Sequence, residues 1–262
     1  MRRINFLIFT IFCLCNTSLF GQGNQDSVML AHSDKWSVKQ NRGLFGLAKP
    51  DFGDFITLDI SRTNSPVVRK KNKDSSNYGV QFSSDGNDVD FAKFITVEKS
   101  KIYKLSLGTT SDTIEALFTI ASVSHEKKQT FLGKMLSKND EGKDQVLDYN
   151  RDVPGTITTR NDTLHWSFFI RNFRSGGRQT SYSTPSASFS DGYLMNDRDS
   201  MYMQIYSSFS ADLVLVNQKE EHLAALAFKQ KHPEIWIRKD IERSYQQAIA
   251  ALFAVIISIK DF

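Results

Sequence analysis

The segment Ala248–Ile257 reads AIAALFAVII and contains no polar side chain. A surface helix carries one apolar stripe at positions i, i+3, i+4 and i+7, whereas this segment is apolar all round, as a buried helix is. Together with the polar residues before it, the segment predicts a helix over Asp240–Ile259. Asp240 is the expected N-cap, because its carboxylate can accept hydrogen bonds from the free N–H groups of the first turn.

The chain before this helix has the pattern of short β-strands separated by polar turns. In Phe55–Ser61, the residues Ile56, Leu58 and Ile60 alternate with others, which is the period-two pattern of a half-buried strand. Further strands are predicted at Tyr78–Phe82, Phe91–Val97, Lys101–Leu107, Thr113–Val123, Gly155–Arg160, Thr163–Arg171, Met201–Phe209, Asp212–Val216, Leu223–Phe228 and Glu234–Arg238. A turn is expected at Glu98–Ser100, a long exposed hairpin or loop at Lys134–Asp152, and a solvated loop at Ser175–Asp191. This spacing favours a mainly β fold, an antiparallel β-barrel or β-sandwich with one buried hydrophobic C-terminal helix.

The N-terminus predicts export. Arg2 and Arg3 precede the apolar core Phe6–Leu14, and a cleavage site before Gln22 would make residues 1–21 a signal peptide. The apolar core is shorter than the ~20 residues of a membrane-spanning helix. Cys13 and Cys15 both lie within it, so the mature chain is expected to be free of cysteine. We expect a polar N-terminal lead-in over residues 22–42, loosely docked, and a single β-rich domain over residues 43–262, located in the periplasm, at the cell surface or outside the cell.

The charge balance does not indicate a nucleic-acid partner. The chain has 33 basic and 29 acidic residues, and two of the basic ones, Arg2 and Arg3, belong to the signal segment. A nucleic-acid-binding module concentrates Lys and Arg on one face. No transmembrane span is predicted in the mature chain, since the apolar part of the terminal helix is bounded by Gln246 and Gln247 on one side and by Ser258 and Lys260 on the other.

A strand at Glu234–Arg238 followed by the apolar helix Tyr245–Leu252 resembles the end of the tubby C-terminal-like superfamily, which includes the scramblase and LURP-one-related proteins. That resemblance implies a closed β-barrel around the C-terminal helix. Some members bind phosphoinositide headgroups, but this chain has no motif onto which their binding residues can be carried. The resemblance therefore bears on fold more than on function.

Two groups of basic residues are candidate binding sites. The densest run contains Arg69, Lys70, Lys71 and Lys73, which is either an anion site for a phosphate, lipid headgroup or surface polysaccharide, or a solvated hairpin tip. The second group, Arg171 and Arg174 near the aromatic residues Trp166, Phe168 and Phe169, is either a cationic stacking platform or a core strand whose arginines emerge into water.

No catalytic residues, metal ligands or cofactor are predicted. The five histidines form no metal-binding spacing, and Ser124–Lys127 matches S-x-x-K without its companion motifs. Asp85, Asn87, Asp88 and Asp90 lack the spacing of an EF-hand loop. We therefore expect a non-enzymatic exported domain that binds an envelope or extracellular ligand or protein. The alternatives are a hydrolase acting on an envelope polymer or glycan, and a tubby-like binder of anionic lipid headgroups.

Overall fold

The computed structural model describes residues 28–42, 47–63, 70–71, 78–82, 89–129, 145–160, 165–171, 191–205, 212–228 and 232–259. The signal segment and Asp85, Asn87 and Asp88 lie outside these ranges, whereas Asp90 lies within them. The strands, in chain order, are β1 (Ser33–Ser37), β2 (Lys39–Arg42), β3 (Ala48–Asp51), β4 (Ile56–Arg62), β5 (Lys70–Lys71), β6 (Tyr78–Phe82), β7 (Val89–Gly108), β8 (Thr113–Gln129), β9 (Gln145–Thr159), β10 (His165–Arg171), β11 (Asp191–Met195), β12 (Ser200–Ile205), β13 (Leu213–Asn217), β14 (His222–Ala227) and β15 (Glu234–Arg238). The helix α3 (Arg243–Ile259) follows the last strand, and a helical turn at 28–32 precedes the first.

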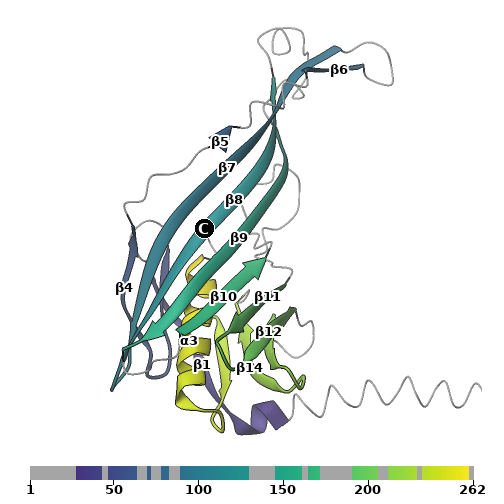
Figure 1. Ribbon diagram of the computed structural model, residues 1–262. Helices are drawn as coiled ribbons and strands as arrows, with labels where there is room; N and C mark the ends of the chain where they lie inside the picture. The colour runs from purple at the N-terminus through teal and green to yellow at the C-terminus, as the bar shows by residue number, and fades with distance from the viewer. Residues whose placement is uncertain are drawn as a thin grey trace, which may run out of the picture.

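Among the described strands, one large antiparallel sheet has the order β1-β15-β14-β13-β12-β11-β10-β9-β8-β7-β4, and β5 and β6 also pair with β7. This sheet curves around α3, which lies inside the curve (Figure 1). The helix contacts strands from distant parts of the sheet, namely β8, β9 and β15, and it also contacts β3. The predicted mainly β fold with one buried C-terminal helix is therefore confirmed.

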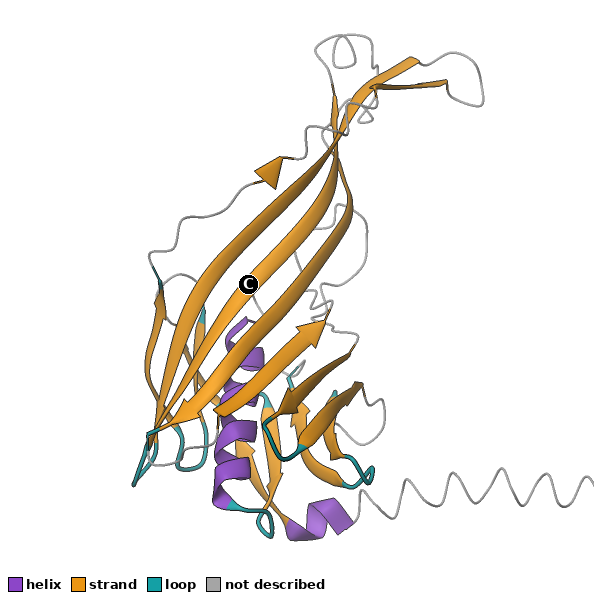
Figure 2. Ribbon diagram, in the orientation of Figure 1, coloured by secondary structure: helices purple, strands orange, loops and turns teal. Residues whose placement is uncertain are grey.

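The core of the molecule is α3 itself. Every residue from Ala248 to Ile257 has 0% of its surface exposed, as expected from a segment that is apolar all round. Ser258 is also fully buried, and its hydroxyl donates a hydrogen bond of 2.7 Å to the carbonyl oxygen of Ala254. Small side chains along the helix let the sheet approach closely, and the larger ones fill the wider gaps. Figure 2 shows the helix with strands on several sides.

The described strands do not close into a barrel, because β1 and β4 are the two ends of the sheet and do not pair. The two-stranded β2–β3 sheet connects these ends in the chain, and β3 contacts both β4 and α3. Thr57 of β4 donates its N–H to Asp51 Oδ1 over 2.7 Å, and its hydroxyl donates to the Pro50 carbonyl. Trp36 of β1 lies 6.2 Å from the ring of Phe55, just before β4. Aromatic packing therefore joins the two edges that backbone hydrogen bonds leave apart.

The first strands differ from the expected loosely docked lead-in. Residues 33–37 pair with β15 along their whole length, from Ser33 opposite Arg238 to Ser37 opposite Glu234. Lys35 forms an ion pair of 2.9 Å with Glu234, and Lys39 begins β2. Trp36 and Val38 are two positions apart, so one aromatic and one aliphatic side chain pack against the core and help to anchor this polar strand at the sheet edge.

Strands β7, β8 and β9 are longer than expected and extend beyond the part of the sheet that covers α3 (Figure 1). The expected turn at Glu98–Ser100 is wrong, because these residues continue β7 opposite Ala121–Val123 of β8. Of the two interpretations of Lys134–Asp152, a hairpin or a loop, the hairpin holds from Gln145 onward, where β9 begins and pairs antiparallel with β8. Where these strands extend beyond the core, pairing with a neighbouring strand satisfies their backbone N–H and C=O groups. Polar side chains therefore do not end the strands there.

The helix begins at Arg243 rather than at Asp240, so the predicted N-cap is also wrong. The carboxylate of Asp240 accepts hydrogen bonds from Arg238, with an Nε–Oδ1 distance of 2.8 Å. The bonds with Arg238 hold the pKa of Asp240 below its usual value. The first helical turn instead starts from the carbonyl of Glu242, which accepts from the N–H groups of Tyr245 and Gln246.

One close approach in the core depends on glycine. Gly155 of β9 lies opposite Phe118 of β8 and Phe168 of β10 in the sheet register. A Cβ atom at Gly155 would lie 2.3 Å from the ring of Phe168. The missing side chain therefore makes room for the large buried rings of the neighbouring strands, including the Tyr103–Phe118 pair stacked at 5.6 Å.

Candidate ligand-binding surface

Strand β10 separates the aromatic residues of its segment between the two faces of the sheet. Trp166, Phe168 and Ile170 are buried in the core, with 1%, 2% and 0% of their surfaces exposed. Phe169 and Arg171 point the other way, toward the outer face, because successive side chains of a strand alternate. The core interpretation therefore holds for Trp166 and Phe168, whereas Phe169 and Arg171 lie together at the surface.

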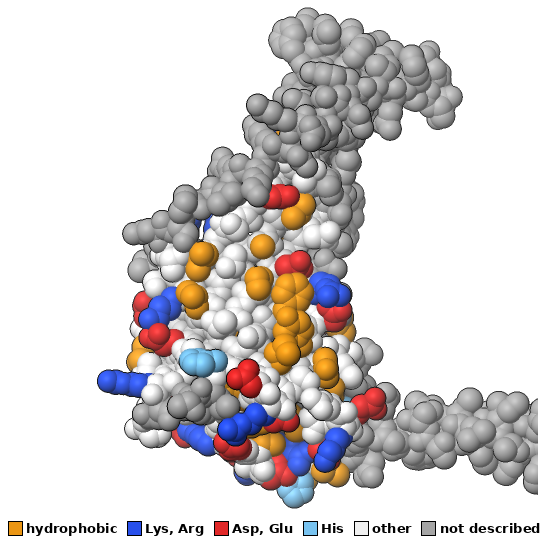
Figure 3. Space-filling view, in the orientation of Figure 1, with side chains coloured by type: hydrophobic (Ala, Val, Ile, Leu, Met, Phe, Trp, Pro, Cys, Tyr) orange, Lys and Arg blue, Asp and Glu red, His pale blue; other side chains and the backbone are white. Residues whose placement is uncertain are grey.

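Neighbouring strands extend Phe169 into a row of rings across the outer face. In the register of the sheet, Phe169 lies between Pro154 of β9 and Tyr193 of β11, and Tyr193 lies opposite Tyr202 of β12. The rings of Phe169 and Tyr193 are stacked, with centroids 5.9 Å apart and planes 22° apart. We call Pro154, Phe169, Tyr193 and Tyr202 the aromatic row. In Figure 3, hydrophobic side chains form a stripe where β10 and β11 lie.

The aromatic row is partly open to solvent. Pro154 is exposed, Tyr202 has 49% of its surface exposed, and Phe169 and Tyr193 are half-buried. Beyond Tyr202 the next residue in register is Val216, which belongs to a separate apolar cluster on the outer face together with Met29 and Trp236. Met29 lies in the helical turn at 28–32. The outer face is therefore covered at Val216 and becomes exposed at Tyr202.

Polar groups border the aromatic row on both sides. On one side the guanidinium of Arg171 lies 5.8 Å from the centre of the Phe169 ring and 3.3 Å from the Asp191 carboxylate. Both members of this ion pair are more than half exposed, so it contributes little to stability. On the other side the Ser200 hydroxyl donates to the Tyr202 hydroxyl over 3.2 Å. The surface thus offers flat apolar rings next to hydrogen-bonding groups.

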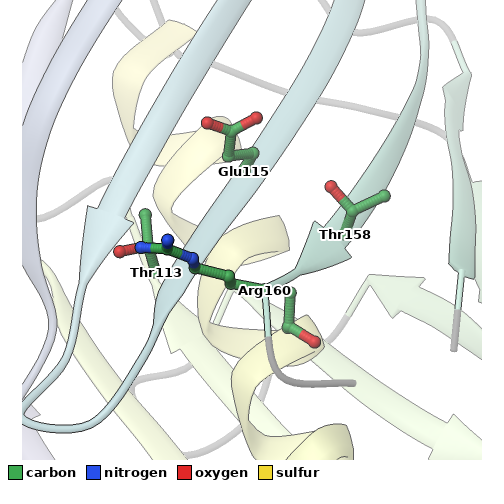
Figure 4. A pocket seen from close by; sticks show the side chains of 5 residues that line it. Thr113, Glu115, Thr158 and Arg160 are labelled. Atoms are coloured by element: carbon green, nitrogen blue, oxygen red, sulfur yellow. The ribbon is translucent and has the colours of Figure 1, made fainter. Parts of the chain in front are cut away.

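A second feature of the outer face is a shallow cleft of about 370 Å³ lined by Thr113, Glu115, Thr158, Thr159 and Arg160. In Figure 4 the Arg160 side chain extends toward Thr113. The only carboxylate among the lining residues, Glu115, forms an ion pair of 2.7 Å with Lys104. Glycoside hydrolysis uses two carboxyl groups on either side of the scissile bond. The lining residues of this cleft supply one.

The predicted binding residues are placed as follows. Arg171 lies beside the aromatic row, and Arg174 falls outside the described residues. Lys70 and Lys71 form β5, opposite Glu98 and Val97 of β7, while Arg69 and Lys73 lie outside the described residues. Pro154, Tyr193 and Tyr202 were not predicted from the sequence. A weak sequence signal for this surface is the short run Gly192–Met195, which belongs to strand β11.

Comparison of the chain with protein-family models, curated proteins and solved structures found no match in any of the three. No helix within the described part of the chain is both long and apolar enough to cross a membrane. Nor do the described residues bring together three His, Cys, Asp or Glu side chains that could hold a metal ion. The surface geometry therefore has to carry the functional argument.

Proposed function

We propose that this protein is an exported, non-enzymatic binding domain that binds a carbohydrate polymer of the cell envelope or of the extracellular space through the aromatic row. The observation that carries the proposal is the stacked, outward-facing pair Phe169–Tyr193, continued on either side by the exposed Pro154 and Tyr202. The predicted signal peptide supports an exported location.

The chemistry of the aromatic row suits a sugar chain. A pyranose ring has apolar C–H faces and a polar rim of hydroxyl groups, so it packs on an aromatic ring while its rim forms hydrogen bonds. Tyrosine likewise combines an apolar ring with a polar end. Strands lie ~4.8 Å apart, so a row across four strands spans ~14 Å, enough for a chain of a few sugars. Arg171, Asp191 and Ser200 lie beside the row, where hydroxyl groups of such a chain would reach them.

A protein partner fits this surface less well. A stable protein interface buries ~800 Å² on each side around a continuous apolar centre. Polar side chains interrupt the apolar surface here, since Ser167 and Arg171 lie on either side of Phe169 along β10 and both are exposed. The resemblance to the tubby C-terminal-like superfamily stays a prediction.

The proposal is tested by sedimentation with insoluble polysaccharides, using peptidoglycan sacculi, chitin and cellulose as probes. Wild-type protein is expected to pellet with at least one of them. The Tyr193→Ala/Tyr202→Ala variant is expected to bind at least about tenfold more weakly, since a stacked ring contributes ~1–3 kcal/mol. Far-ultraviolet circular dichroism of each variant checks that the sheet is retained.

The matched control is Ile56→Ala, which removes an exposed apolar side chain from β4 at the far end of the sheet. It is expected to bind like the wild type. Equal binding by the wild type and the double variant would contradict the proposal. Release of soluble sugar from the pelleted polymer by the wild type would instead favour the hydrolase alternative.

A further inference from the structure

The sheet register gathers a second group of side chains on the opposite, inner face, where β7–β9 extend beyond the helix. Lys99 and Lys101 have the same direction along β7 as the buried Tyr103 and Leu105. Arg62 of β4 lies opposite Tyr103. On β9, Arg151 has the same direction as the buried Val153, and Ser122 of β8 pairs with both Lys99 and Arg151. We call Arg62, Lys99, Lys101 and Arg151 the inner basic cluster.

The other three cations of this cluster are close enough to Lys101 for their charges to act on it. Burial lowers the pKa of the Lys101 amine, and the positive charges of Arg62, Arg151 and Lys99 lower it further. Burial raises the pKa of the Tyr103 phenol, while Arg62 and Arg151 oppose that increase. Arg62 and Arg151 come from strands on opposite sides of β7 and β8, and the charges of both act on Lys101 and Tyr103 between them.

The cluster also has fixed hydrogen-bonding groups. Arg151 has only 8% of its surface exposed, and its guanidinium donates from Nε to the Tyr149 hydroxyl over 3.0 Å while lying 5.2 Å from the Tyr149 ring. Packing of this kind holds a guanidinium in one orientation. The carboxylate of Glu126, farther along β8, accepts from the Ser124 hydroxyl and lies 3.2 Å from the Lys128 amine. Its charge is already engaged by neighbours on its own strand.

We propose that the inner basic cluster binds an oxyanion that carries two or more negative charges, of the phosphate type. Arginine guanidinium groups bind phosphate through two parallel hydrogen bonds, and lysine adds a mobile point charge. Several cations on one face of the sheet match the charge of such an anion better than that of a single carboxylate. This site is independent of the aromatic row, because the two groups lie on opposite faces of the sheet, so either can exist without the other.

The test measures pyrophosphate binding to the full chain by isothermal titration calorimetry and by the shift in melting temperature. The Lys99→Gln/Lys101→Gln variant is expected to lose about tenfold in affinity for each cation removed, because a hydrogen bond to a charged group contributes about that much. The matched control is Lys104→Gln, on the same strand but on the outer face, where Lys104 pairs with Glu115. It is expected to bind like the wild type.

Sedimentation with vesicles of phosphatidylcholine and phosphatidate distinguishes a lipid headgroup from a free phosphate. Binding of pyrophosphate without vesicle binding identifies a soluble ligand, and binding of both, lost together in the double variant, identifies a headgroup. Wild-type protein that binds neither probe overturns the proposal. An equal loss in Lys104→Gln also overturns it, because nonspecific charge would then explain the binding. If pyrophosphate has no effect and the double variant alone lowers the melting temperature, the cations serve groups of the chain itself and the proposal fails.

Discussion

Replacing Leu252 with alanine should reveal how much stability the enclosed helix contributes. Leu252 is fully buried in the middle of α3, and strands from distant parts of the sheet contact this helix. Removing about three CH₂ groups from an apolar site costs ~2.4 kcal/mol at ~0.8 kcal/mol each. A helix enclosed by a hydrogen-bonded sheet cannot shift far to fill the space, so a cavity cost adds to this. We expect a total loss of ~3–5 kcal/mol in the free energy of unfolding.

Equilibrium unfolding in urea measures this loss as a lower midpoint at an unchanged m-value. Leu58→Ala is the matched control, since it makes the same change in β4 at a side chain with 57% of its surface exposed. A surface change of this kind costs at most ~0.5 kcal/mol. If Leu252→Ala were no more destabilising than Leu58→Ala, α3 would not be the core of the fold.

Two further predictions concern the same helix. Ala251→Asp should prevent folding, because it forces an unpaired carboxylate into a site with no exposed surface, and the yield of folded protein after refolding measures this. Tyr245 donates a hydrogen bond to the Asp199 carboxylate, and burial, followed by that bond, raises the pKa of Tyr245 from 10.0 to about 12. The folded protein therefore keeps this proton after the unfolded chain has lost it, so stability should fall as pH rises from about 10 to about 12, and Tyr245→Phe should remove this part of the fall. A Tyr245→Phe variant with the same pH dependence as the wild type would contradict the role of this bond.

The sequence predicts the elements whose signal is local. An apolar run without a polar face leaves only a buried position for the helix at Ala248–Ile257, and alternation places β4 and β15 within one residue of their observed bounds. The N-cap prediction at Asp240 failed because its carboxylate can accept hydrogen bonds from groups other than the helix N–H groups. The nearby Arg238 offers a charge-assisted hydrogen bond that exposed backbone N–H groups do not match.

The candidate surface was only partly predictable, because its residues come together across strands. Arg171 and Phe169 are two positions apart and both belong to the predicted group of basic and aromatic residues, but Pro154, Tyr193 and Tyr202 join them only through the register of four strands. That register depends on where β9 and β11 begin. Polar residues in both segments prevented the prediction of these strand starts. The inner basic cluster was missed for the same reason, since Glu98–Ser100 suggested a turn and separated Lys99 from Lys101.

The most direct test of the proposed function is to map a bound sugar on the protein by nuclear magnetic resonance. Amide chemical shifts are followed during titration with soluble peptidoglycan fragments, chito-oligosaccharides and cello-oligosaccharides. Binding at the aromatic row predicts that the largest changes fall on β10, β11 and β12 around Phe169, Tyr193 and Tyr202. Changes confined to the cleft around Glu115 and Arg160, or no changes with any of the three sugars, would contradict it.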